Sequence, residues 1–189
     1  MAVDHYSKEW AYFLLKDYAQ ALTHLEKAVE KSPEDGEIWF FIGYCQERLG
    51  NYQEAEIAYQ HVIQTKSHII WTHAAHFCLG FTNENLGRYD KSIEAYKQAI
   101  KINPEYAKAY QNLAVAYTKL NRFQEAFEAT TQAIRLDSKN IEAHYLRGLM
   151  SLILGSINIA LEEHQILKML DQKMALELLN AINKTKKPA

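Results

Sequence analysis

The chain is poor in the residues that end helices and form turns. Glycine and proline supply only 7 and 3 of the 189 residues, about 5% together, where about 12% is ordinary usage. A chain with so few turn formers is expected to be mostly helical. Its length suits one domain or a short array of repeats, and it is sufficient to bury a hydrophobic core.

The chain also has little net charge, few cysteines and no long apolar run. The 21 Lys and Arg residues nearly balance the 23 Asp and Glu residues, which argues against a nucleic-acid binder because phosphate binding requires clustered cations. Two cysteines make no disulfide framework, so we expect a reducing compartment such as the cytoplasm. The longest apolar run, 38–45, is too short to cross a bilayer, so no membrane insertion is expected. No signal peptide is visible, but the helical pattern begins within the first few residues, so a segment with a targeting signal could precede residue 1.

Six of the seven glycines fall in pairs with the same internal spacing. The pairs are Gly43 and Gly50, Gly80 and Gly87, and Gly148 and Gly155. An aromatic residue or His lies four residues before the first glycine, and Leu directly precedes the second. After the first two pairs, Tyr follows the second glycine by two residues. Similar surroundings recur at 110–133, with Asn121 in place of the second glycine, and again at 18–33. The chain therefore contains five copies of an internal repeat.

This order of an aromatic residue, Leu-Gly, Tyr, Ala, a second aromatic residue and Pro resembles the tetratricopeptide repeat. The resemblance covers residues 2 to about 170. It implies an all-α fold, a right-handed superhelix (α-solenoid) of about five helix-turn-helix repeats. The first repeat is degenerate, because Glu9 stands where a small residue belongs, and extra residues within 65–71 predict a longer connection before the third repeat. The predicted repeats are 2–35, 36–72, 73–106, 107–140 and 141–170.

The physical chemistry of the pattern agrees with the resemblance. The second glycine of each pair can take the left-handed conformation that ends a helix, and the first lets two helices approach closely. Residues 171–184 have a further amphipathic pattern, which predicts a C-terminal helix that caps the open end of the array. This helix is expected to cover Tyr145, Leu149 and Leu152, together with Ile159, Ile166 and Leu167. Residues 185–189 are expected to form a flexible basic tail.

Motifs for catalysis are missing from the sequence. It contains no Gly-rich phosphate loop, no HExxH and no GxSxG, and the acidic pair Glu162 and Glu163 is expected on a helix surface. We therefore expect no enzyme and no cofactor. His73 and His76 are spaced to share one side of a helix, as metal ligands would. His76, however, occupies a slot that aromatic residues fill in other repeats, so a metal site is the lesser alternative.

The resemblance implies that the first helix of each repeat lines a concave groove. The residues next to the packing stripe are expected to face it. They are aromatic in the first three repeats and polar in the fourth, and a helix that is apolar on a second face requires a second partner. The predicted groove residues are Trp10, Phe40, Phe41, Tyr44, Phe77, Phe81, Lys108, Asn112 and Lys119.

These features favour a protein-interaction scaffold without enzymatic activity. Its groove is expected to bind a peptide or helix of a protein partner, with Lys108, Asn112 and Lys119 contacting a polar or acidic part of the same ligand. Two alternatives stay open: the aromatic side chains pack against one another or under a preceding segment, or a terminal segment of one molecule fills the groove of the next. Small bacterial tetratricopeptide scaffolds, including those on magnetosome surfaces, are similar in size and repeat number. They illustrate the second alternative, a self-assembling homo-oligomer.

Overall fold

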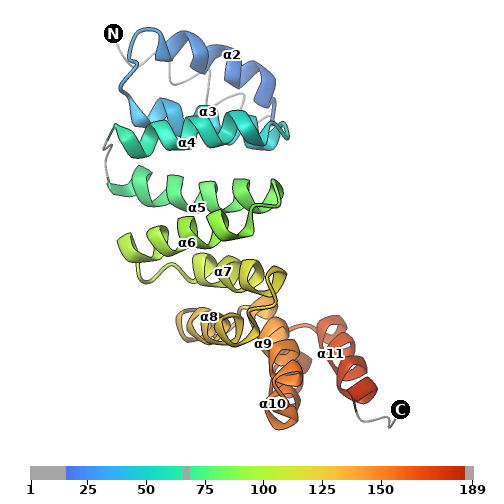
Figure 1. Ribbon diagram of the computed structural model, residues 1–189. Helices are drawn as coiled ribbons and strands as arrows, with labels where there is room; N and C mark the ends of the chain where they lie inside the picture. The colour runs from blue at the N-terminus through green and yellow to red at the C-terminus, as the bar shows by residue number, and fades with distance from the viewer. Residues whose placement is uncertain (1–15, 66–68, 186–189) are drawn as a thin grey trace. The chain divides into compact units, whose positions relative to one another are not determined.

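A computed structural model describes residues 16–65 and 69–185, and every regular element within these ranges is a helix. Successive helices pack side by side within two compact units, Met1–Ile102 and Asn103–Ala189 (Figure 1). The all-α expectation is therefore confirmed. The described residues of the first unit form α2 (Tyr18–Val29), α3 (Gly36–Arg48), α4 (Tyr52–Gln64), α5 (Ile69–Asn85) and α6 (Tyr89–Ile102). Those of the second are α7 (Ala107–Lys119), α8 (Phe123–Leu136), α9 (Ile141–Ile153), α10 (Ile157–Leu170) and α11 (Gln172–Thr185).

The turn inside each repeat has the left-handed residue that the sequence predicts. Gly50, Gly87 and Gly155 have φ values of +82°, +72° and +81°, which glycine adopts without steric penalty. Asn121 and Lys16 take φ of +57° at the corresponding points of the repeats that lack this glycine. The amide of the next residue then donates to the carbonyl five residues back, with a distance of 2.8 Å after Gly50. This bond closes a Schellman-type helix end.

The first glycine of each pair in the first unit lies under a tyrosine ring of the following helix. A Cβ atom added to Gly43 would lie 2.7 Å from a ring carbon of Tyr59, and one added to Gly80 would lie 2.5 Å from the ring of Tyr96. Both tyrosines are fully buried. A larger residue at either glycine would therefore push the two helices of the repeat apart.

The extra residues before the third repeat form helix rather than loop where they are described. Helix α5 has 17 residues, whereas α3 has 13, and the additional turn is at its N-terminus. This turn carries Trp71, which packs against Phe40 and Phe41 of α3. Residues 66–68 lie outside the described ranges.

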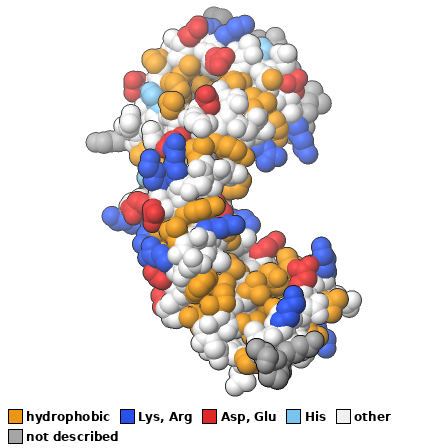
Figure 2. All heavy atoms as spheres, turned by 45° about the vertical axis from the view of Figure 1, so that its right-hand side comes forward, with side chains coloured by type: hydrophobic (Ala, Val, Ile, Leu, Met, Phe, Trp, Pro, Cys, Tyr) orange, Lys and Arg blue, Asp and Glu red, His pale blue; other side chains and the backbone are white. Residues whose placement is uncertain are grey.

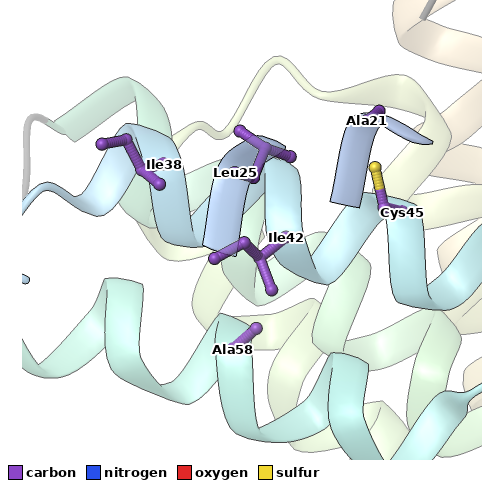
Figure 3. Close-up of a cluster of buried hydrophobic side chains, with 6 residues drawn as sticks. All are labelled: Ala21, Leu25, Ile38, Ile42, Cys45 and Ala58. Atoms are coloured by element: carbon purple, nitrogen blue, oxygen red, sulfur yellow. The ribbon is translucent and has the colours of Figure 1, made fainter. Parts of the chain in front are cut away.

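One hydrophobic cluster joins α2, α3 and α4 (Figure 3). Its buried members are Ala21 and Leu25 of α2, Ile38, Ile42 and Cys45 of α3, and Ala58 of α4. The sulfur of Cys45 points toward Ala21 in this cluster. Burial raises the pKa of the Cys45 thiol to about 12, because it disfavours the thiolate. Cys45 is therefore a core residue without nucleophilic character.

The C-terminal helix α11 packs on both α9 and α10, as a cap should. Its side chain Leu178 fills the notch beside Gly148, since a Cβ atom there would lie 2.6 Å from a methyl carbon of Leu178. In the first unit a tyrosine of the same repeat fills this notch, but the equivalent residue here is His164. Its Nδ1–H donates to the carbonyl of Ala175 in α11 at 2.9 Å. The cap thus supplies the packing that the last repeat lacks.

The predicted coverage by this cap is largely right. Tyr145, Leu149 and Leu152 pack against the cluster that contains Leu178, and Leu167 is fully buried. Two residues depart from the expectation: Ile159 is half-buried and outside this cluster, and 39% of the surface of Ile166 stays exposed.

The expectation that Glu163 lies on a helix surface is wrong. Only 1% of Glu163 is exposed, and its carboxylate accepts hydrogen bonds from His144 Nδ1 and Arg147 Nη1, both at 2.5 Å. The other ring nitrogen of His144 lies 3.1 Å from the carbonyl of Ser138. The hydrogen bond to Glu163 is the main cause that raises the pKa of His144 above its usual 6.5. His144 therefore joins α9 to α10, with an oxygen atom beside each of its ring nitrogens.

Replacement of Leu178 by Ala should lower the free energy of unfolding of the second unit by about 2–5 kcal/mol, because a buried leucine is lost from the notch. Leu176→Ala is the matched control, since Leu176 lies in the same helix and is 58% exposed; it should change stability by about 0.5 kcal/mol at most. All three tryptophans belong to the first unit. Urea unfolding followed by circular dichroism should therefore shift more than unfolding followed by tryptophan fluorescence. Equal effects of the two leucine variants would contradict the capping role.

The ion cluster should make the stability of the second unit depend on pH. Because the pKa of folded His144 is raised, its contribution to stability is complete well below pH 6.5 and disappears as pH rises through the raised pKa. The difference in unfolding free energy between the natural chain and His144→Gln should thus be larger at pH 5 than at pH 9. Urea titrations of both proteins at a series of pH values measure it. A difference that stays constant or grows with pH would rule out a protonated His144.

Candidate functional site

Two repeats of the first unit contain the same set of three contacting side chains, which we call the Phe-Tyr-Glu triplets. The members are Phe40, Tyr59 and Glu47 in one repeat, and Phe77, Tyr96 and Glu84 in the next. In each triplet the phenylalanine and tyrosine ring centres lie 5.7 Å apart. The tyrosine hydroxyl donates to a glutamate oxygen at 3.2 Å in both. The phenylalanine and glutamate come from the first helix of the repeat, and the tyrosine comes from the second.

The carboxyl group of Glu47 is partly withdrawn from water. Burial raises its pKa to about 7, and the hydroxyl of Tyr59 and the charge of Arg48 offset only part of that effect. Cys78 of α5 adjoins the same group, and the pKa of its thiol is raised to about 12, mainly by burial. Near neutral pH, Glu47 is therefore poised between its charged and neutral forms.

Phe40 and Phe41 take part in an aromatic cluster with Trp71. The ring centres of Phe40 and Phe41 lie 5.1 and 5.5 Å from that of Trp71, and both phenylalanines are half-buried. The alternative in which groove aromatics pack against one another thus applies in part to these two. Trp71 was not among the predicted site residues. The signal that could have found it is its place in the extra residues before the third repeat.

Tyr44 packs at the other end of α3. Its ring centre lies 6.0 Å from that of Tyr18, and the guanidinium of Arg48 lies over both rings, at 5.6 Å from Tyr18 and 5.9 Å from Tyr44. Arg48 is thereby directed toward α2.

Phe81 is the most exposed of the predicted aromatic residues that the structure describes. It is 38% exposed, whereas Phe77, in the same helix, is half-buried in its triplet. We call the part of α3 and α5 that carries the triplets, Phe41, Tyr44, Trp71 and Phe81 the triplet face. Hydrophobic side chains reach the surface at several places (Figure 2). Outside the triplet face, Ile57 in the first unit and Met169 in the second are exposed.

Of the remaining predicted site residues, three lie on α7 of the second unit and one lies outside the described residues. Lys108 and Lys119 are exposed on α7, and Asn112 is half-buried between them. Trp10 lies outside the described residues. The structure therefore brings Phe40 and Phe41 of α3 together with Trp71 of α5, and the polar residues of α7 belong to the second unit.

A metal site at His73 and His76 gains no further ligand from the described residues. Within 16–65 and 69–185, no three His, Cys, Asp or Glu side chains are grouped to hold a metal ion. Burial is the main cause that lowers the pKa of His76, and Glu94 opposes it. His68, the third histidine nearby, lies outside these ranges.

None of the helices in the described ranges is both long and apolar enough to cross a membrane. What the described ranges contain is a tandem array of helix pairs with a repeated internal contact, which defines a helical-repeat protein. Two family descriptions match its sequence: "Tetratricopeptide repeat" at residues 10–67 and 107–140, and "TPR repeat" at residues 85–121. The chain belongs to the tetratricopeptide repeat family.

Two named relatives match parts of the chain or most of it. Human serine/threonine-protein phosphatase 5 is 33% identical over 94 residues, which are 47% of this chain and 19% of the phosphatase. The tetratricopeptide repeat-containing protein trd-1 of Caenorhabditis elegans is 22% identical over 173 residues, which are 90% of this chain and 17% of that protein. The chain spans about a fifth or less of the length of these relatives.

Solved structures share the fold. MamA from Desulfovibrio magneticus RS-1, residues 41 to the end, has a TM-score of 0.80 at 20% identity, over 89% of this chain and 94% of that one. YrrB, described as a TPR protein with an unusual peptide-binding site, has a TM-score of 0.78 at 15% identity, over 95% and 92% of the two chains. At these identities the likeness establishes the fold alone.

Alanine substitutions should separate packing from exposed aromatic residues on the triplet face. Phe40→Ala removes contacts with Tyr59 and Trp71 and should lower the free energy of unfolding by about 2–3 kcal/mol. Phe81→Ala should lower it by less than about 1 kcal/mol, because Phe81 is substantially exposed. Tryptophan fluorescence during urea unfolding reports both changes. Similar losses for the two variants would place Phe81 in the core.

Proposed function

We propose that this chain is a protein-interaction scaffold without enzymatic activity, and that its triplet face binds a peptide or helix of a protein partner. The observation that carries the proposal is the exposure of Phe81 beside the half-buried aromatic side chains of α3 and α5. These helices also pack on α2, α4 and α6, in part through Tyr44, Phe40 and Phe77 of the same face. An additional apolar face on a packed helix is typical of a docking surface.

The family supports the same function. Tetratricopeptide arrays bind partner segments on extended surfaces that stacked repeats create, and one structural neighbour is described by its peptide-binding site. Lys108, Asn112 and Lys119 on α7 stay a separate prediction, in which they contact a polar or acidic segment of a ligand. A reducing compartment such as the cytoplasm fits the two free cysteines.

Self-assembly is the second candidate function. Met169 is 89% exposed and Leu176 is 58% exposed, on neighbouring helices of the second unit, and Ile166 adds a third apolar side chain there. Exposed apolar residues of this size favour contact with another protein surface, a second copy included. Light scattering over a range of protein concentrations distinguishes a monomer with a foreign partner from a homo-oligomer.

A random peptide library displayed on phage tests the first candidate directly. Selection on the full chain should enrich peptides with apolar anchor residues, and their affinity for Phe81→Ala should fall by at least about 30-fold, as expected for a hot spot worth about 2 kcal/mol. Ile57→Ala is the matched control, because Ile57 is 63% exposed on α4 and away from the triplet face. Fluorescence anisotropy measures the affinities. Selected peptides that bind both variants equally well would contradict the proposed site.

A further inference from the structure

We propose that a groove between α10 and α11, in the second unit, is a second docking surface, and that it binds an acidic amphipathic helix of a partner protein. We call it the end groove. It has a volume of about 410 Å³ and is lined by His164 and Lys168 of α10 and by Gln172, Ala175, Leu176 and Leu179 of α11. None of these residues belongs to the triplet face, so the inference goes beyond the function proposed for that face and does not depend on it.

Helix α11 packs on the array as the first helix of a further repeat would. In the earlier repeats, α5 packs on α3 and α4, and α9 packs on α7 and α8. Helix α11 packs in the same way on α9 and α10. The second helix of the same repeat covers α5 and α9 in turn, but no second helix packs on α11 among the described residues. A helix is therefore the shape of partner that this end of the array can accept.

The register between α9 and α11 is set by their buried residues. Each helix buries an alanine near its start and a large apolar residue seven positions later. These are Ala143 and Met150 in α9, and Ala175 and Ile182 in α11. When the two pairs are aligned, the other residues of α11 can be compared with their counterparts in α9.

In this register, Leu176 and Leu179 stand where α9 has His144 and Arg147. Those two residues of α9 contact the second helix of their repeat, because both lie within hydrogen-bonding distance of Glu163 in α10. Leu176 is 58% exposed, and Leu179 is half-buried. A cap that served packing alone would present polar residues at such positions. Two leucines there favour an apolar docking surface instead.

The charge of the end groove favours an acidic ligand. Among the described residues that line it, Lys168 is the one with a permanent charge, and none carries a carboxylate. None of the ion pairs within 4 Å in the described ranges includes Lys168. The nearest carboxylate in sequence, that of Asp171, accepts a hydrogen bond from the amide of Met174 at 2.9 Å and thereby caps α11. An Asp or Glu of a docked helix would supply a counterion for Lys168.

An amphipathic helix matches both features of the end groove. Its apolar side chains, spaced three or four residues apart, would cover Leu176 and Leu179. An Asp or Glu within one turn of these anchors would pair with Lys168 on the opposite wall. Met169, which follows Lys168 and is 89% exposed, adds apolar surface beside the groove.

Selection from a phage library of amphipathic helical peptides tests the proposal. The target is the full chain with Phe81→Ala, so that binding at the triplet face is weakened. Enriched peptides should carry Leu, Met or Phe anchors with an Asp or Glu within one turn of an anchor. Lys168→Glu in the same background should reverse the charge preference to Lys or Arg. Lys139→Glu, at an exposed site of the second unit, is the control and should select the same peptides as the target.

The affinity of one selected acidic peptide locates its site. Leu176→Ala should weaken binding by at least about tenfold, as the loss of a central apolar contact does. Ile153→Ala is the matched control, because Ile153 is 54% exposed on α9 and does not line the groove. The bound peptide should slow amide hydrogen exchange in α10 and α11 and leave α3 and α5 unchanged. Circular dichroism checks that each variant is folded.

Several results would overturn the proposal. They are the enrichment of no peptide, enriched peptides without an acidic preference, an acidic preference that survives Lys168→Glu, and slowed exchange outside α10 and α11. A dimer in light scattering that Leu176→Ala dissociates would assign the groove to a second copy of the chain and would also overturn it. None of these results bears on the triplet face, whose test is the loss of affinity caused by Phe81→Ala in the natural chain.

Discussion

The contact between a tyrosine ring and a glycine backbone organises the first unit. Tyr59 on Gly43 and Tyr96 on Gly80 leave no room for a Cβ atom, so the ring fixes how closely the two helices of each repeat approach. The same ring holds a phenylalanine along one edge and directs its hydroxyl to a glutamate of the facing helix. Packing and the candidate site are therefore not independent. The residue that closes the repeat also positions the only donor that the structure shows on the Glu47 carboxylate.

In the second unit, other residues meet the same steric requirement. In the fourth repeat, Ala114 stands in place of the glycine and Thr130 in place of the tyrosine. The side chain at the first position is thus slightly larger than glycine, and the one that meets it is smaller than tyrosine. In the fifth repeat, Gly148 stays but His164 replaces the tyrosine, and Leu178 enters from the cap. A terminal repeat has no following repeat to pack on, so its notch is available to a helix beyond the array. The ion cluster of His144, Arg147 and Glu163 joins the same pair of helices by charge where the first unit uses a ring.

Much of this fold could be predicted because the repeat imposes a register. The small residues and the turns follow from spacing, and Asn121, which stands in place of the second glycine, has the same left-handed backbone. The missed residues, Trp71 and Glu163, depend on contacts between elements. Trp71 lies in added residues that have no counterpart in the other repeats. Glu163, by contrast, occupies the position of Ala58, Ala95 and Ala129, all buried. The register of the repeat therefore indicates that Glu163 is buried. It does not indicate the partners that stabilise the buried charge, His144 and Arg147, because they lie on α9.

One position near the end of the first helix of each repeat is occupied differently where another helix covers it. Glu47, Glu84, Thr118 and Leu152 occupy equivalent positions in successive repeats. Where α11 covers the slot, the residue is Leu152, and it packs into the apolar cluster of the cap. A carboxylate in a covered slot would be unfavourable unless it were paired, as Glu163 is. Glu47 has no such pairing within the described residues, and its raised pKa records the resulting unfavourable desolvation. A repeat that needed only packing here would gain from an apolar side chain.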